Sequence, residues 1–148
     1  MNETVRFVRL PHNLDLPLPS YETSGSAGMD LPAAISERIV LESLDRIAIP
    51  TGLKIAIANG FEGQVRPRSG LAFRHGLTVT NAPGTIDSDY RGELKVLLVN
   101  LGKESIIIER GMRIAQLVIA PVVQVTVAEV LDLDNTERGA QGFGSTGV

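Results

Sequence analysis

Short runs rich in β-forming and apolar residues, separated by turn signals, follow one another along most of the chain, and Val123–Val127 alternates with period two; this is the pattern of β-strands. The clearest runs are Val5–Leu10, Arg46–Pro50, Leu53–Ala58, Leu94–Leu101, Ser105–Glu109 and Val123–Val127. Turn-forming pairs recur between the runs, at Asn59-Gly60, Glu62-Gly63, Arg91-Gly92 and Arg110-Gly111. Many short strands with regular turns predict an all-β fold, a jelly-roll-like distorted barrel or sandwich.

Two stretches depart from this pattern. Ser69–His75 predicts one short helix, with Ser69 as its candidate N-cap. From residue 135 onward the chain is polar and rich in glycine. No repeat or linker divides the rest. We therefore expect a β jelly-roll domain at residues 1–134 and a flexible glycine-rich C-terminal arm at residues 135–148.

Composition narrows the class of protein. A chain of 148 residues, with 43% hydrophobic and 21% charged residues, is expected to fold as one globular domain. Its net charge of −3 offers no basic field for a nucleic-acid partner. The absence of cysteine excludes disulfides and thiolate chemistry. Met1–Thr4 does not resemble a secretory signal, and no apolar run approaches the ~18 residues of a membrane span. We expect a cytoplasmic protein without a membrane partner.

The most informative segment surrounds Asn81–Gly84. Val79 before it and Ile86 after it predict the two arms of a β-hairpin. The Asn81 amide presents one donor and one acceptor, which suits the edge of a heterocycle that carries N–H beside C=O. Asp87 follows the turn, where its carboxylate could hold a water molecule. The same residues also fit a hairpin with a solvated acidic turn.

Other stretches could bind an anion. If a helix starts near Arg68, its guanidinium, the Ser69 hydroxyl and free backbone N–H groups all favour one. The alternative is a capped helix with a surface arginine. Gln116 lies in the strand-like run Arg113–Leu117, which could equally be a core strand with one polar residue.

The glycine-rich tail carries Arg138 and Phe143. A flexible loop of this make-up can fold over phosphate while the aromatic ring stacks on a base; the alternative is a disordered tail. Residues 142–147 match G-x-G-x-x-G, but no strand leads in and no helix follows, so a dinucleotide fold is rejected. No G-K-[ST] sequence exists, which excludes a P-loop enzyme.

Acidic and histidine residues give weaker indications. Asp30, within Ala27–Leu31, is either a turn carboxylate or a group that reaches a hydrated cation. His12 and His75 lie apart without metal-ligand spacing, and both are interpreted as surface residues.

Taken together and in order, these stretches resemble the five motifs of the deoxyuridine triphosphatase (dUTPase) family. The similar segments are Ala27–Leu31, Pro67–Ala72, Gly84–Glu93, Arg113–Leu117 and Arg138–Gly147. Each motif alone is weak, but their combination over residues 27–147 is specific.

The resemblance implies a jelly-roll homotrimer whose active sites are shared among subunits. It implies hydrolysis of dUTP to dUMP and pyrophosphate by water attack on the α-phosphate, with Mg²⁺ bound across the phosphates. This reaction limits the dUTP available for DNA synthesis and supplies dUMP. Asp87 then orients and activates the water, Asp30 reaches Mg²⁺ through water, and Tyr90 lies under the deoxyribose and leaves no room for a 2′-hydroxyl.

The remaining substrate contacts implied by the resemblance fall into three groups. Those to the phosphate chain are Arg68, Ser69, Gly70 and Gln116. Those to uracil are Asn81 with Gly84, Thr85 and Ile86. Those from the arm are Phe143 over uracil, with Arg138, Gly144, Ser145 and Thr146 around the γ-phosphate. No role for Arg91 or Glu93 follows from the sequence.

Two alternative functions stay open. The dCTP deaminase family shares the fold and resembles I-D-P-G-[FW] from Ile86 onward, with a catalytic glutamate ten residues after the aspartate. This chain has Ser88–Tyr90 in place of P-G-[FW] and Leu97 at the glutamate position. The second alternative is a regulatory protein that binds the nucleotide without turnover.

Overall fold

The computed structural model describes residues 4–144 and residue 147. These residues form ten strands and one short helix, which confirms the all-β fold class. The strands are β1 (Arg6–Arg9), β2 (Gly28–Pro32), β3 (Ile39–Leu41), β4 (Arg46–Ala56), β5 (Phe61–Arg66), β6 (Leu77–Val79), β7 (Gly84–Ile86), β8 (Glu93–Asn100), β9 (Ile106–Ile108) and β10 (Arg113–Pro121). The helix α1 spans Ser69–His75.

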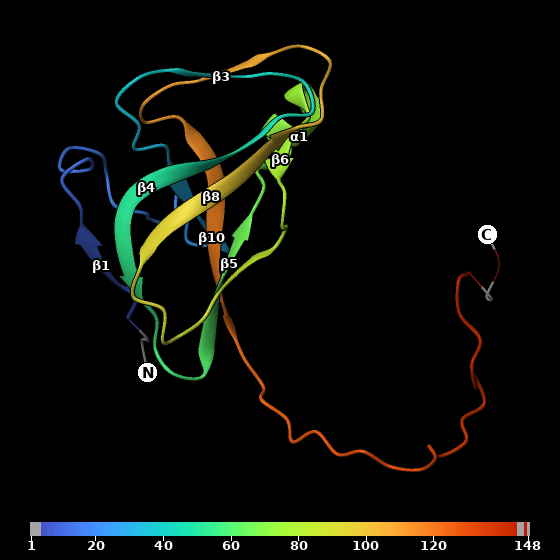
Figure 1. Ribbon diagram of the computed structural model, residues 1–148. Coiled ribbons are helices and arrows are strands. Elements are labelled where there is room, and N and C mark those ends of the chain that lie inside the picture. The colour runs from blue at the N-terminus through green and yellow to red at the C-terminus, as the bar shows by residue number, and fades with distance from the viewer. Residues whose placement is uncertain (1–3, 145–146, 148) are drawn as a thin grey trace.

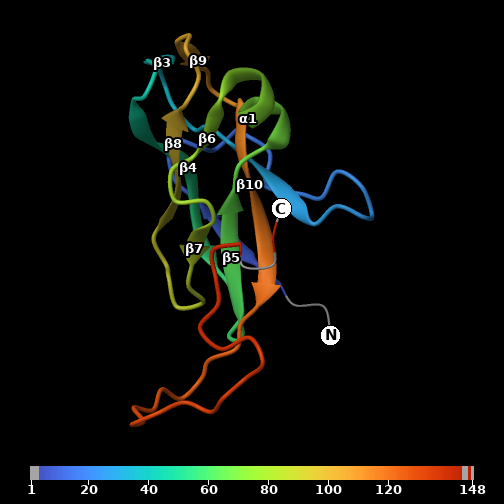
Figure 2. The same ribbon diagram turned by 90° about the vertical axis from the view of Figure 1, so that its right-hand side faces the viewer.

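The strands build two open antiparallel sheets rather than a closed barrel. One has the order β1-β4-β8-β6, the other has the order β2-β10-β5-β7, and β3 and β9 form a small separate pair. Figure 1 shows the β4-β8 layer lying over the β5-β10 layer, and Figure 2 shows the two layers from the side. The expected two-layered β-structure is therefore present, without a closed barrel, while the jelly-roll connectivity stays a prediction.

The core lies between the two sheets because their strands alternate in burial. In β8, Leu94, Val96 and Leu98 are each 0% exposed, whereas Lys95 and Leu97 point outward. On the facing sheet Leu31 and Leu117 are also fully buried. Burial of each such side chain contributes about 1.5–3 kcal/mol to folding, so the period-two pattern specifies which face of each strand turns inward.

The buried polar side chains are paired. Asn100, at the end of β8, donates from Nδ2 to the carbonyl oxygens of Leu41 (3.0 Å) and Glu104 (2.8 Å), and its Oδ1 accepts the Gly102 amide (2.9 Å). Within the described residues, every buried side-chain nitrogen or oxygen has a hydrogen-bond partner. Such satisfied polar groups hold loops in place without the cost of an unpaired buried atom.

The predicted hairpin around Asn81–Gly84 is wrong. β6 pairs with β8 in one sheet, whereas β7 pairs with β5 in the other. The segment therefore crosses between the two layers instead of turning back within one. Each short arm hydrogen-bonds to a longer strand of its own layer, and this tertiary pairing replaces the local pairing that the turn residues suggested.

The helix prediction is confirmed in extent, but its cap is not. Arg68 occupies the N-cap position with extended backbone (φ −94°, ψ 128°), and no side-chain capping bond is formed. Ser69 is the first helical residue, so the predicted cap is wrong by one position. Gly76 ends the helix at φ 71°, a left-handed conformation that glycine adopts without strain. No helix in the described part of the chain is long and apolar enough to cross a membrane.

The two predicted runs on either side of Thr51-Gly52 form a single strand, β4. The pairing with β8 shifts register between Pro50 and Lys54, and Gly52 has φ 67°. Between these positions β4 advances four residues while β8 advances two, and extra residues of this kind bend a strand without ending it. The resulting bulge lies against the loop that follows β1, because the Leu10 amide donates to the Gly52 carbonyl oxygen at 2.8 Å.

The chain beyond Pro121 leaves the body of the molecule (Figure 1). A strand at Val123–Val127 was predicted, and for the isolated chain this is wrong: Val123, Val125 and Val127 are 86%, 76% and 90% exposed and lie outside the strands. Alternation favours a strand only where another strand supplies its hydrogen bonds. The division at residues 134 and 135 stays a prediction.

Candidate active site

A cavity of about 560 Å³ opens where β2, β10 and the start of α1 meet. Its wall contains the four residues expected to contact the phosphate chain from the body of the molecule, Arg68, Ser69, Gly70 and Gln116, together with Asp30, which was expected near the metal. They come from three segments that are far apart in sequence. Pairing of β10 with both β2 and β5 brings them together, with Gln116 opposite Asp30 on one side and Arg66 on the other. We refer to this hollow as the polar cavity.

A carboxylate between two guanidinium groups dominates the charge of the polar cavity. Asp30 Oδ1 lies 3.1 Å from Arg68 Nε, and Asp30 Oδ2 lies 3.1 Å from Arg113 Nη1. Glu22 Oε1 lies 3.8 Å from the same Arg113 nitrogen. The Arg68 side chain is 30% exposed and also donates to the Arg113 carbonyl oxygen at 3.0 Å. These contacts hold Arg68 in one orientation, as recognition of an anionic oxygen requires.

Gln116 and Gly28 lie in close contact in the wall of the polar cavity. Gln116 Nε2 donates to the Pro67 carbonyl oxygen at 2.9 Å, which orients the amide. Gly28 lies so close that a Cβ atom at this position would stand 2.2 Å from Gln116 Oε1. The absence of a side chain at Gly28 is therefore what leaves room for the Gln116 carboxamide.

A second, narrower cavity of about 160 Å³ lies where β7 and β8 diverge. It contains the residues expected to contact the base and sugar, namely Asn81, Gly84, Thr85, Ile86 and Tyr90, and in addition Val65, Glu93, Lys95 and Leu97. Gly84 is buried, and a Cβ there would meet Asn81 Nδ2 at 3.1 Å and Val65 Cβ at 3.3 Å. We refer to this hollow as the narrow cavity.

Tyr90 is held in a compact turn beside the narrow cavity. Its amide donates to the Asp87 carbonyl oxygen (3.1 Å), and its hydroxyl donates to the Glu93 carbonyl oxygen (2.8 Å). The ring covers Gly92, where a Cβ would stand 2.4 Å from the hydroxyl oxygen. Arg91 donates to the carbonyl oxygens of Ser88 and Tyr90, each at 2.7 Å. These contacts hold the Tyr90 ring in a defined position beside the narrow cavity.

Asp87 belongs to neither of these cavities. It is exposed and lines a third hollow of about 660 Å³ together with Glu62, Asp89 and Thr85. Thr85 also lines the narrow cavity, so the two hollows adjoin. The single chain therefore brings Asp87 next to the expected base-binding residues, but it does not place Asp87 in the polar cavity.

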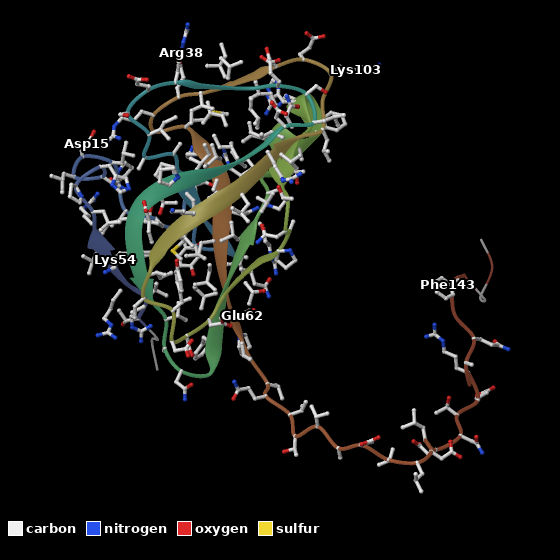
Figure 3. All side chains as sticks on the ribbon, viewed as in Figure 1. Asp15, Arg38, Lys54, Glu62, Lys103 and Phe143 are labelled. Carbon is white, nitrogen blue, oxygen red and sulfur yellow. The ribbon has the colours of Figure 1, made fainter. Side chains whose placement is uncertain are left out.

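The arm residues lie away from all three hollows. Figure 3 shows Phe143 near the far end of the arm, remote from the sheet that carries Glu62. Phe143 is 114% exposed. Among the described residues, the Arg138 side chain donates one hydrogen bond, from Nε to the carbonyl oxygen of the nearby Gln141. Gly144 is also exposed. Ser145 and Thr146 lie outside the described residues.

Sequence reasoning missed several cavity residues. Arg74, His75 and Glu22 line the polar cavity, and Lys95 lines the narrow one. The outward phase of β8 could have indicated Lys95, because it alternates with the buried Leu94 and Val96. Nothing in the sequence places Glu22 near Arg113, since the loop that carries Glu22 has no periodic pattern.

A metal site made by protein ligands alone is absent from the described residues: no group of three or more His, Cys, Asp or Glu side chains could hold an ion. Both oxygens of Asp30 already face guanidinium groups. A hydrated cation that arrives with a phosphorylated ligand suits this arrangement better than a dedicated cage, because Mg²⁺ commonly keeps its waters and binds through substrate phosphates.

The fold and the two cavities define an all-β protein with a hollow that contains guanidinium groups and a second, narrow hollow beside an aromatic ring, an arrangement that suits a small phosphorylated ligand. A sequence profile described as dUTPase matches residues 15–147. The chain belongs to the dUTPase family.

Individual relatives cover nearly the whole chain. A deoxyuridine 5′-triphosphate nucleotidohydrolase of Rhizobium johnstonii is 58% identical, covering 100% of this chain and 96% of the relative. One from Mesorhizobium japonicum is 61% identical, covering 98% of this chain and 91% of the relative. The solved structure of a Staphylococcus bacteriophage 80alpha dUTPase mutant with dUpNHpp superposes with a TM-score of 0.87 at 28% identity, covering 98% of this chain and 99% of that one.

Proposed function

We propose that the protein is a dUTP diphosphatase, which hydrolyses dUTP to dUMP and pyrophosphate. One observation carries the proposal within this family member: the residues expected for base and sugar line one cavity, and those expected for the phosphates line another. The narrow cavity offers the Asn81 amide to a flat heterocycle and the Tyr90 ring to a sugar. The polar cavity offers the Arg68 guanidinium to phosphate oxygens.

The proposed chemistry asks the protein mainly to position its groups. In phosphoryl transfer, catalysis comes from alignment of the nucleophile and neutralisation of charge more than from covalent steps. Asp87 orients the attacking water and accepts its proton, while Arg68, Ser69 and Gln116 hold the phosphate chain. Asp30 is the carboxylate that would contact the water shell of Mg²⁺, which would supply neutralisation of phosphate charge when bound with the substrate.

We further propose that the active site is completed between subunits of a homotrimer. Within one chain the polar cavity, the Asp87 hollow and the arm lie apart, although one substrate must contact all three. The segment at residues 122–134 carries exposed valines and leucines with no partner strand, which suits docking on a neighbouring copy. The arm of one subunit then closes over a site that another subunit supplies.

The deaminase alternative is disfavoured by the residue at position 97. Leu97 lines the narrow cavity and is 39% exposed, so an aliphatic side chain stands where the resemblance to deaminases requires a glutamate. A leucine cannot transfer protons. A regulatory protein that binds the nucleotide without turnover is distinguished from the enzyme by the rate of pyrophosphate release from dUTP. The cytoplasmic location stays a prediction.

A substrate panel tests the activity. The purified protein with Mg²⁺ should release pyrophosphate from dUTP and leave dCTP, dTTP and UTP nearly untouched. Ammonia release from dCTP at a comparable rate would overturn the proposal. Binding of dUTP without pyrophosphate release would instead support the regulatory alternative.

Subunit complementation tests the shared site. Two variants are made, Asp87→Asn and a truncation before Arg138, each expected to be inactive alone. If arm and Asp87 come from different subunits, mixed and reassembled oligomers should regain part of the activity. No recovery in mixtures that light scattering shows to be trimeric would contradict a site shared in this way.

A further inference from the structure

The strongest unassigned feature of the molecule is a chain of contacts that runs from the loop after β1 to the turn that carries Tyr90. It passes through Glu93, the first residue of β8. The Glu93 side chain is 17% exposed, well below the exposure of an ordinary surface carboxylate. Its two partners come from different segments: Glu93 Oε1 lies 2.5 Å from His12 Nε2 and accepts the Gly52 amide at 2.9 Å.

Glu93 uses its backbone for a different contact. Its carbonyl oxygen accepts the Tyr90 hydroxyl at 2.8 Å. Both residues line the narrow cavity. The position of the Tyr90 ring therefore depends on where the Glu93 backbone lies, and the Glu93 side chain is anchored by His12 and Gly52. Because Gly92 lacks a side chain, the ring rests directly on the backbone between them.

The anchor itself is rigid. Gly52 is buried in the β4 bulge, and a Cβ at this position would stand 2.3 Å from Asn13 Cβ. Asn13, which is 0% exposed, donates from Nδ2 to the Thr51 carbonyl oxygen at 2.6 Å. The Thr51 hydroxyl, also buried, donates to the Leu94 carbonyl oxygen at 2.6 Å, next to Glu93. A fully satisfied buried polar network of this kind holds one geometry.

We propose that Glu93 and His12 are positioning residues. They fix the position of the Tyr90 ring beside the narrow cavity, and this position sets the discrimination between dUTP and UTP. The inference rests on the proposed function, in which Tyr90 lies under the deoxyribose. His12 donates from Nε2 in its neutral Nε2–H tautomer and in its protonated form alike. Loss of the His12 contact leaves the Gly52 amide as the described partner of the Glu93 carboxylate, so the Glu93 end of the turn is held less firmly, the ring shifts, and space for a 2′-hydroxyl opens.

The test compares kcat/KM for dUTP with kcat/KM for UTP in single variants. His12→Ala is expected to lower the dUTP:UTP ratio by about tenfold, the scale of discrimination that a change in pocket shape produces. Tyr90→Phe, which removes the hydroxyl that reaches Glu93, is expected to lower the ratio similarly. Glu93→Gln, which keeps an acceptor oxygen, is expected to retain most of the discrimination.

Asp15→Asn is the matched control. Asp15 lies on the same loop as His12 and pairs with Arg110, but it lines none of the three hollows. This variant should keep the wild-type ratio, and thermal unfolding of every variant shows whether a change in ratio accompanies loss of fold. A purely structural role of His12 would lower the melting temperature and leave the ratio unchanged, which would overturn the proposal.

A double-mutant cycle separates positioning through Tyr90 from an independent effect. If His12 acts through the Tyr90 hydroxyl, the variant with both changes should have nearly the same ratio as Tyr90→Phe alone. Additive losses would show that His12 acts by another route and would refute the inference. Failure of the wild-type protein to hydrolyse dUTP would refute the proposed function instead, so the two failures are distinguishable.

Discussion

Gly28→Ala should disable the polar cavity while it leaves the fold nearly intact. The added Cβ would stand 2.2 Å from Gln116 Oε1, 3.1 Å from its Cδ and 3.3 Å from its Cβ. Normal contact distances between non-bonded heavy atoms are about 3.5 Å, so the carboxamide must withdraw by about 1 Å. A displacement of this size at a positioning group can lower the rate about 100-fold. We therefore expect kcat/KM for dUTP to fall by about 30- to 100-fold.

The cost in stability should be much smaller. The crowded atom is at the end of a flexible side chain, and its withdrawal forfeits one hydrogen bond, Gln116 to the Pro67 carbonyl oxygen, worth about 1 kcal/mol. Replacement of a strand glycine by alanine returns about 0.5–1 kcal/mol. The free energy of unfolding should thus stay within about 1 kcal/mol of wild type, a shift of a few degrees in Tm at most.

Pyrophosphate release and urea unfolding check the two parts of this prediction. Gly25→Ala is the control, because no heavy atom lies within 4 Å of a Cβ at that position. Gln116→Ala should reproduce the loss of kcat/KM without crowding. Wild-type kcat/KM in Gly28→Ala would refute the role of Gln116 in phosphate binding, and a large loss of stability would refute its freedom to withdraw.

Three further changes have distinct expected results. Asp87→Asn should keep affinity for a non-hydrolysable dUTP analogue but lower kcat about 10³-fold, within the range for loss of a general base; a near-wild-type kcat in single-turnover kinetics would contradict its role. Truncation before Arg138 should preserve the circular dichroism spectrum and Tm yet abolish most turnover, and full activity would make the arm a bystander. Gly76→Ala should lower the free energy of unfolding by about 1–3 kcal/mol, because Gly76 has φ 71° and a Cβ there would lie 2.5 Å from the Gly102 nitrogen; unchanged urea stability would exclude that close packing.

The sequence predicted best where local chemistry and tertiary structure agree. The apolar runs became β1, β8 and β9 as expected, and in β8 every second residue from Leu94 to Asn100 is buried. Helix α1 was predicted over its full extent. The structure also groups the motif residues: Asp30, Arg68, Ser69, Gly70 and Gln116 line the polar cavity, whereas Asn81, Gly84, Thr85, Ile86 and Tyr90 line the narrow one. Their roles toward a nucleotide stay predictions.

Errors arose where a partner distant in sequence decided the outcome. The flanks of Asn81–Gly84 suit a hairpin locally. In the structure β6 pairs with the longer strand β8 and β7 pairs with the longer strand β5, so the two flanks lie in different sheets. Val123–Val127 alternates like a strand and has no partner within the chain. Strand pairing depends on hydrogen bonds to another segment, so alternation alone cannot identify the partner.

By itself the sequence determined the all-β class, the short helix, the inward phase of the core strands and the membership of the motifs, because these depend on residue type and near neighbours. Only the tertiary structure decided that the predicted site divides into a polar cavity, a narrow cavity and a separate hollow for Asp87. It also gave Glu93 a role, since His12, Gly52 and Tyr90 meet it through contacts that span up to 81 positions in the chain. Contacts at that range leave no local signature, because they arise from how the two sheets pack.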